Sequence, residues 1–137
     1  MAVLPYNYDD GKIVLLPAKA SVVFVKGGMV KDDAAGYIDV CVAGDGVTVR
    51  FVAAQTITAA ATDGATLVPC WPTTGVRFIA DTDADPAQTD VGTLCDIATG
   101  STLDPDASAD DIFFIEKILG PVADRKVLGF FSQANET

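Results

Sequence analysis

Residues 91–131, VGTLCDIATGSTLDPDASADDIFFIEKILGPVADRKVLGFF, decide the fold of this chain. They contain three short apolar runs, VGTLCDI, DIFFIEKIL and KVLGFF, separated by an acidic loop rich in Asp, Ser and Thr and by a Gly-Pro turn. Short apolar runs bounded by turn-forming residues are typical of β-strands. No segment of the chain sustains a 3.6-residue apolar period over three turns, so an all-β fold is predicted.

The same pattern continues through the rest of the 137 residues. No internal repeat and no domain boundary is evident, so we expect a single β domain at residues 11–137, preceded by an arm at residues 1–10. Periodicity does not separate a barrel from a sandwich. Strands are predicted at residues 12–16, 21–26, 37–42, 47–53, 65–68, 75–80, 91–97, 112–119 and 126–131.

The clearest predicted hairpin covers residues 37–53. Apolar residues alternate in both arms, and the AGDG link at residues 43–46 supplies the positive φ that tight hairpin turns require. A turn at Gly44-Asp45 places Asp39 opposite Arg50, whereas a turn at Asp45-Gly46 leaves them diagonal. Both registers direct the same residues to the core, because side chains alternate with period two.

The arm at residues 1–10 has no strand pattern, yet it carries Leu4, Tyr6 and Tyr8. An apolar but unpatterned arm is held either by a neighbouring subunit or by the barrel of its own chain. Both alternatives stay open at this point.

Charge and hydropathy disfavour two classes of partner. The net charge is −10, and the nine basic residues are scattered, whereas nucleic-acid binding depends on clustered Lys and Arg. No apolar run approaches the ~20 residues of a membrane-spanning helix. An acidic surface instead keeps a concentrated protein soluble or meets a basic patch on a partner.

The residues needed for common catalytic mechanisms are missing. The chain has no histidine, which excludes Ser-His-Asp triads, Cys-His dyads and HExxH zinc sites. It also lacks GxGxxG, GxxxxGK[ST] and GxSxG motifs. Ser21 and Lys26 form a nominal Ser-Lys pair, but nothing marks a desolvated lysine. We therefore predict that the protein is not an enzyme and has no cofactor.

The DTDAD run that begins at residue 81 carries Asp at the first, third and fifth positions of an EF-hand loop. The match fails at the sixth position, where Pro86 replaces Gly, and at the twelfth, where Gly92 replaces Glu. A solvated loop of turn-forming Asp residues is the favoured interpretation. A looser calcium site is the alternative, with Asp81, Asp83, Asp85 and Asp90 as its ligands.

Three cysteines, Cys41, Cys70 and Cys95, are too few and too scattered for a disulfide framework, and no CxxC spacing suggests zinc. We predict three reduced structural thiols. Trp71 and the Phe130-Phe131 pair are candidate interface anchors, since aromatic residues concentrate in binding hot spots. Burial in or over the end of a barrel is the favoured alternative for these aromatic residues.

The chain resembles the small capsid decoration, or cement, proteins of tailed bacteriophages. An apolar N-terminal arm leads into KASVVFVKGGMVKDDAAGYIDVCVAGDGVTVRFVAA, where Gly-rich links punctuate successive strands. The chain then closes with a "vG-x-x-x-D" strand from Val91-Gly92 to Asp96, a polar loop, a "D-x-F-x-I" strand at residues 111–115 and a final strand at residues 127–131.

The resemblance implies a small antiparallel β-barrel or β-tulip-like subunit with an extended arm. It also implies binding to the major capsid protein on the outside of an icosahedral shell, as a trimer at three-fold positions, after assembly in a host cytoplasm. Contact candidates are Leu4, Tyr6 and Tyr8 for the shell, and Phe130 and Phe131 for the trimer or the shell. A carbohydrate- or receptor-binding β module, with Trp71 beside an acidic loop, is the alternative.

Overall fold

The computed structural model describes residues 3–5, 13–46 and 48–132. Within these residues the regular structure consists of antiparallel strands and two single 3₁₀ turns, η2 (Gln88–Asp90) and η3 (Val122–Asp124), and there is no α-helix. The prediction of an all-β fold is therefore confirmed.

The first of the two large sheets has the strand order β2-β8-β6-β4-β5. It curls until its edges meet, where a parallel bridge joins Ala18 to Ile38, and we call it the first barrel. A two-stranded ribbon, β3 (Val23–Phe24) with β7 (Ile57–Thr58), covers its interior. The strands of the first barrel are β2 (Val14–Pro17), β4 (Met29–Asp32), β5 (Ile38–Val40), β6 (Phe51–Ala53) and β8 (Leu67–Pro72).

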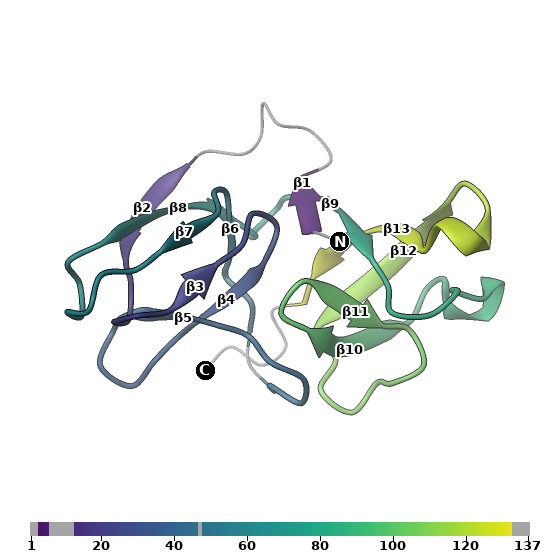
Figure 1. Cartoon of the computed structure of the whole chain (residues 1–137). Coiled ribbons are helices and arrows are strands. Elements are labelled where there is room, and N and C mark those ends of the chain that lie inside the picture. The colour runs from purple at the N-terminus through teal and green to yellow at the C-terminus, as the bar shows by residue number, and fades with distance from the viewer. Residues whose placement is uncertain (1–2, 6–12, 47, 133–137) are drawn as a thin grey trace.

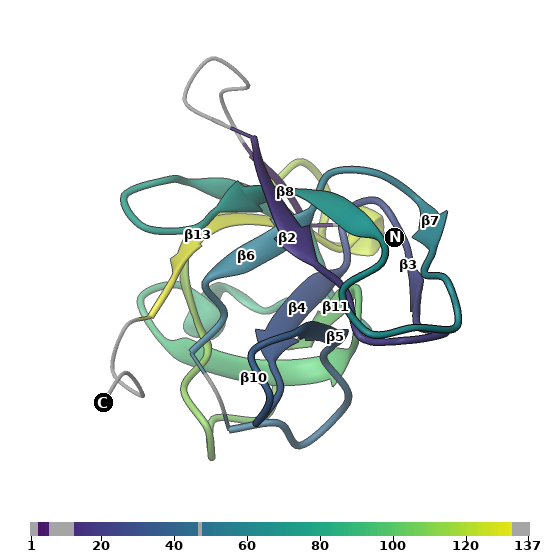
Figure 2. The ribbon, with the colours of Figure 1, turned by 90° about the vertical axis from the view of Figure 1, so that its left-hand side faces the viewer.

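The second sheet has the order β1-β9-β13-β12-β10-β11. It also curls, and a parallel bridge joins Thr82 to Leu103. Its five strands β9-β13-β12-β10-β11 form the second barrel. Figure 1 shows the two barrels side by side, and Figure 2 views the molecule from the side of the first barrel. The strands of this sheet are β1 (Val3–Pro5), β9 (Phe78–Asp81), β10 (Leu94–Thr99), β11 (Thr102–Asp104), β12 (Phe113–Leu119) and β13 (Lys126–Phe131).

The two barrels have the same topology. When the five strands of each barrel are numbered along the chain, their order across the sheet is first, fifth, fourth, second, third in both barrels. In both, a parallel bridge from the end of the first strand to the third strand closes the sheet. The registers also agree at every pair of strands. The chain is therefore an internal structural duplication, which the sequence did not reveal. Equivalent positions include Met29 and Leu94, Val52 and Phe114, Trp71 and Phe130, Leu15 and Ile79, and Ala18 and Thr82.

Alternation along the strands separates two apolar clusters. Inward side chains of the first barrel, such as Val30 and Cys70, pack under the β3–β7 ribbon. Their outward neighbours Met29, Val52 and Trp71 instead join the cluster that fills the second barrel. The outer side of the first barrel therefore packs against the second barrel, and burial of this apolar surface holds the two halves together.

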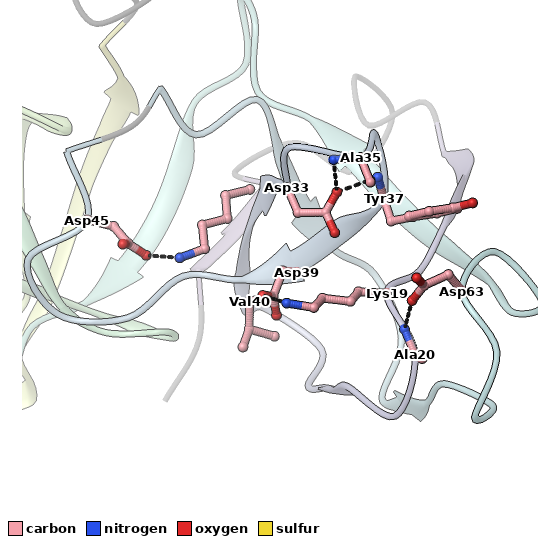
Figure 3. A network of polar contacts seen from close by, with 10 residues as sticks. Lys19, Ala20, Asp33, Ala35, Tyr37, Asp39, Val40, Asp45 and Asp63 are labelled. Atoms are coloured by element: carbon pink, nitrogen blue, oxygen red, sulfur yellow. Dashed lines mark hydrogen bonds and ion pairs between the residues drawn. The ribbon is translucent and has the colours of Figure 1, made fainter.

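The predicted hairpin at residues 37–53 is wrong. β5 pairs with β4, and β6 pairs with the other edge of β4 and with β8. The Asp33 carboxylate closes the β4–β5 turn by accepting the N–H groups of Ala35 (2.8 Å) and Tyr37 (3.0 Å), as Figure 3 shows. Asp39 consequently lies opposite Lys31, and neither predicted pairing with Arg50 occurs.

Part of the predicted arm belongs to the second sheet. Val3 and Leu4 pair with Ala80 and Ile79 of β9, and the Val3 side chain is fully buried. Strands β1, β4, β7 (Ile57–Thr58) and β11 were not among the predicted strands. The remaining predicted strands are present with ends shifted by a few residues, and the strand at residues 126–131 coincides with β13.

Candidate interaction surface

Charge is divided unequally between the two barrels. Residues 13–76, which contain the first barrel, have five Asp, no Glu and four Lys or Arg. Residues 77–132, which contain the second, have eleven Asp or Glu and only four Lys or Arg. The first barrel is therefore nearly neutral, whereas the second carries most of the negative charge of the described chain.

Exposed apolar side chains show the opposite distribution. Of the eight large hydrophobic residues that are exposed in the described chain, six lie in residues 13–76. Leu15, which is 59% exposed, pairs with Pro69, and Leu67 pairs with Pro17 on the same outward side of β2 and β8. We call the surface formed by Ile13, Leu15, Leu67 and Pro69 the β2–β8 face.

A smaller apolar hollow lies where the ribbon, β4 and the β10–β11 turn meet. Its volume is about 220 Å³, and Val23, Val25, Met29 and Val40 line it together with the backbone of Gly100. The Met29 N–H donates to the Gly100 carbonyl at 2.7 Å, which fixes the first barrel against the second at this point.

The aromatic residues nominated from the sequence separate into buried and exposed ones. Trp71 is only 5% exposed and Phe131 only 3%, and both belong to the core. Phe131 meets the rings of Phe78 and Phe113 edge-on. Phe130 is 40% exposed, so it is the one of the three that is available at the surface.

Phe130 stands beside a hollow in the surface. This hollow has a volume of about 420 Å³, and Thr73, Gly75, Val76 and Phe130 contribute to its lining. Phe130 stacks on Phe114, with ring centroids 5.0 Å apart. Aromatic stacking of this kind fixes the orientation of the exposed ring.

The N-terminal contact candidates fall in two categories. Leu4 is half-buried in β1 and packs against the core of the second barrel. Tyr6 and Tyr8 lie outside the described residues.

The acidic loop at residues 81–90 is held by ion pairs and a turn. Its Asp residues bind Lys126, Arg125 and a backbone N–H, and no group of three or more carboxylates in the described ranges is arranged to hold a metal ion. The contacts are Asp81 to Lys126 Nζ (2.7 Å), Asp85 to Arg125 Nε (2.9 Å) and Asp90 to the Ala87 N–H (2.7 Å).

Carboxylates of the two acidic loops lie close to one another. Partial desolvation raises the pKa of Asp83, and the negative charges of Asp104 and Asp106 raise this pKa further. Their repulsion is a local cost that the Arg125 charge reduces.

Asp96 organises the second acidic loop. The residue is 7% exposed, and its carboxylate accepts the N–H groups of Ala109 (2.9 Å), Asp110 (2.8 Å) and Asp111 (3.1 Å). Buried carboxylates are stable where backbone donors replace the lost water. The sequence marked Asp96 as the end of the "vG-x-x-x-D" strand but did not reveal this role.

The three cysteines are free and buried. Burial raises the pKa of Cys41, Cys70 and Cys95 to about 12. Since the thiolate is the reactive species, these side chains are inert near neutral pH and act as small apolar groups.

Comparison with models of protein families, with curated proteins and with solved structures finds no match. In the part of the chain that the structure describes, no helix is long and apolar enough to cross a membrane.

Proposed function

We propose that the protein is a virion structural protein that binds the outer surface of an icosahedral capsid and stabilises it. Its partner is the major capsid protein, and it acts as a trimer at three-fold positions of the capsid exterior. The observation that supports this function is the polarity of the surface, with exposed apolar side chains on a nearly neutral barrel and excess carboxylates on the other.

In this proposal the β2–β8 face contacts the shell and the acidic barrel points to solvent. Full burial of one large aliphatic side chain is worth about 1.5–3 kcal/mol, so completing the burial of three half-exposed ones contributes roughly 3 kcal/mol per copy. A binding contribution of this size is weak for one molecule. A trimer engaging three equivalent sites multiplies the effect, because the second and third contacts form at high effective concentration.

The chemistry of the described residues supports a non-catalytic role. The thiols are buried with raised pKa values, and the chain has no histidine. The carbohydrate-binding alternative depended on Trp71, whose indole is buried in the core, so no observation favours it.

Co-sedimentation tests the proposal. Expanded empty shells of the major capsid protein encoded in the same genome are mixed with the wild-type chain, with Leu15→Asp and with Val122→Asp. Val122 is a matched control, since it is 46% exposed but lies on η3, away from the β2–β8 face. We expect the wild type and the control to sediment with shells and raise their melting temperature, and Leu15→Asp to bind at least about tenfold more weakly.

A wild-type protein that stays in the supernatant at saturating concentration contradicts capsid binding. Equal binding by the wild type and Leu15→Asp contradicts the role of the β2–β8 face.

A further inference from the structure

The internal duplication allows the outward faces of the two barrels to be compared position by position. In the first barrel the residues Met29, Val52 and Trp71 form a continuous row across β4, β6 and β8. This row points away from the interior of its own barrel and is buried against the second barrel.

The equivalent row of the second barrel consists of Leu94, Phe114 and Phe130, on β10, β12 and β13. We call it the aromatic row. Leu94 and Phe114 are half-buried, and Phe130 is 40% exposed. No third barrel in the described chain covers this row, although its side chains are as apolar as those of the buried row.

The surroundings of the aromatic row are suited to a contact. The hollow of about 420 Å³ adjoins Phe130 and provides space for a side chain of a partner. The row itself is uncharged, although its barrel carries eleven acidic residues. At the rim, Arg77 is neutralised by Glu116 through a 2.9 Å ion pair.

We propose that the aromatic row binds a second copy of this chain. Within one chain the equivalent Met29–Val52–Trp71 row is buried by the other barrel, and a neighbouring copy would likewise bury the aromatic row. The intramolecular contact is the basis for this choice, because its partner is a barrel of the same topology. The inference rests on the homo-oligomer of the proposed function and gives that oligomer its contact face.

Two other occupants fit the surface less well. A basic partner would be attracted to the acidic loops, not to an uncharged row. The C-terminal residues 133–137, Gln-Ala-Asn-Glu-Thr, follow Ser132 at the edge of the hollow but contain no large apolar side chain that could replace contacts with the rings.

Sedimentation velocity of the isolated protein over a dilution series tests the inference, with Phe130→Asp and Leu15→Asp as the matched pair. Both variants place a charge at an exposed apolar site, but only Phe130 belongs to the row. We expect the wild type and Leu15→Asp to form the same oligomer and Phe130→Asp to remain monomeric at all concentrations. The Tm of the monomeric fraction should be retained.

A second measurement leaves the row intact. In Thr74→Cys the new thiol lies between two residues that line the hollow, and the native thiols are buried, so a bimane label reacts there alone. We expect its emission to shift to the blue as the oligomer forms. Deletion of residues 133–137 should not change the oligomer.

A wild type that is monomeric at every concentration overturns the inference, as does oligomer loss in Leu15→Asp but not in Phe130→Asp. An unchanged bimane emission on oligomerisation also overturns it. If the wild type is monomeric but Phe130→Asp loses binding to shells, the row contacts the capsid instead, and capsid binding survives while this inference fails.

Discussion

Replacement of Asp96 by Ala should destabilise the second barrel. The carboxylate accepts three backbone N–H groups from the loop between β11 and β12, and its own N–H donates to the Ala107 carbonyl at 3.0 Å. A hydrogen bond to a charged group contributes about 1.5–3 kcal/mol. The three bonds are not additive, and water reaches part of the released loop, so we expect a loss of about 2–4 kcal/mol.

Urea denaturation followed by tryptophan fluorescence measures this loss, and a thermal scan should show a Tm decrease of roughly 10 °C. Asp106→Ala is the control, since it removes one carboxylate from the loop that Asp96 binds without removing an acceptor of these N–H groups. Asp96→Asn should fall between the two, because its amide oxygen still accepts the bonds from Asp110 and Asp111. If Asp96→Ala lies within about 0.5 kcal/mol of the control, the loop does not depend on this carboxylate.

Four further outcomes follow from the described contacts. The three thiols, with pKa values of about 12, should not react with a disulfide reagent at pH 8 until the protein is unfolded; fast reaction of the native protein would contradict their burial. Asp83→Asn should raise the Tm at pH 7, and the gain should shrink at acidic pH, because a carboxyl with a raised native pKa costs stability only while ionised; an unchanged Tm at pH 7 argues against the repulsion. Gly129→Ala should cost about 3 kcal/mol or more, because the new Cβ would overlap the Phe114 carbonyl and lie 2.7 Å from the Phe113 ring; a neutral result in urea denaturation would contradict this packing. Val3→Ala should cost roughly 2 kcal/mol in the same assay, whereas unchanged stability would mean that the arm does not pack on its own chain.

The fold class was predictable because it depends on local patterns. Alternating apolar residues between Gly, Pro and Asp turns identify strands without knowledge of their partners. For this reason β13 was predicted with its correct ends, and β12 to within one residue. The alternation also shows that adjacent Phe130 and Phe131 face opposite sides of a strand, so the sequence alone could have separated the exposed ring from the buried one.

Strand partners were less predictable, because the two-residue alternation of side chains along a strand is the same whichever strand lies beside it and in whichever register. The links at residues 33–36 and 43–46 are both rich in turn residues. The first link forms the hairpin turn, because the Asp33 carboxylate accepts two backbone N–H groups there. The alternation of apolar and polar residues in the sequence does not show these hydrogen bonds.

The duplication was hidden for a related reason. Few equivalent positions share the same residue, as Met29 and Leu94 or Trp71 and Phe130 show. Their spacing also changes along the chain, from 65 residues between Met29 and Leu94 to 59 between Cys70 and Gly129, because the connecting loops differ in length. A search for a fixed period therefore has nothing to detect.

The two barrels differ most in the loops between equivalent strands. In the first barrel these loops form the β3–β7 ribbon, which covers the interior with the buried side chain of Phe24. In the second barrel the corresponding segments are the acidic loop at residues 81–90 and η3. Arg125, which follows η3, joins the two segments by donating to the Asp85 carboxylate and the Asp83 carbonyl.

This contrast shows which positions are free to carry function. Inward positions must exclude water, so both barrels keep the same apolar interior and the same register. Outward positions and loops have no such constraint, and here one half became apolar and nearly neutral while the other became acidic. The outward rows are the exception, since both are apolar although only one is buried within the chain. That shared property, on a barrel that is otherwise strongly charged, is best explained if the exposed row is also covered in the working assembly.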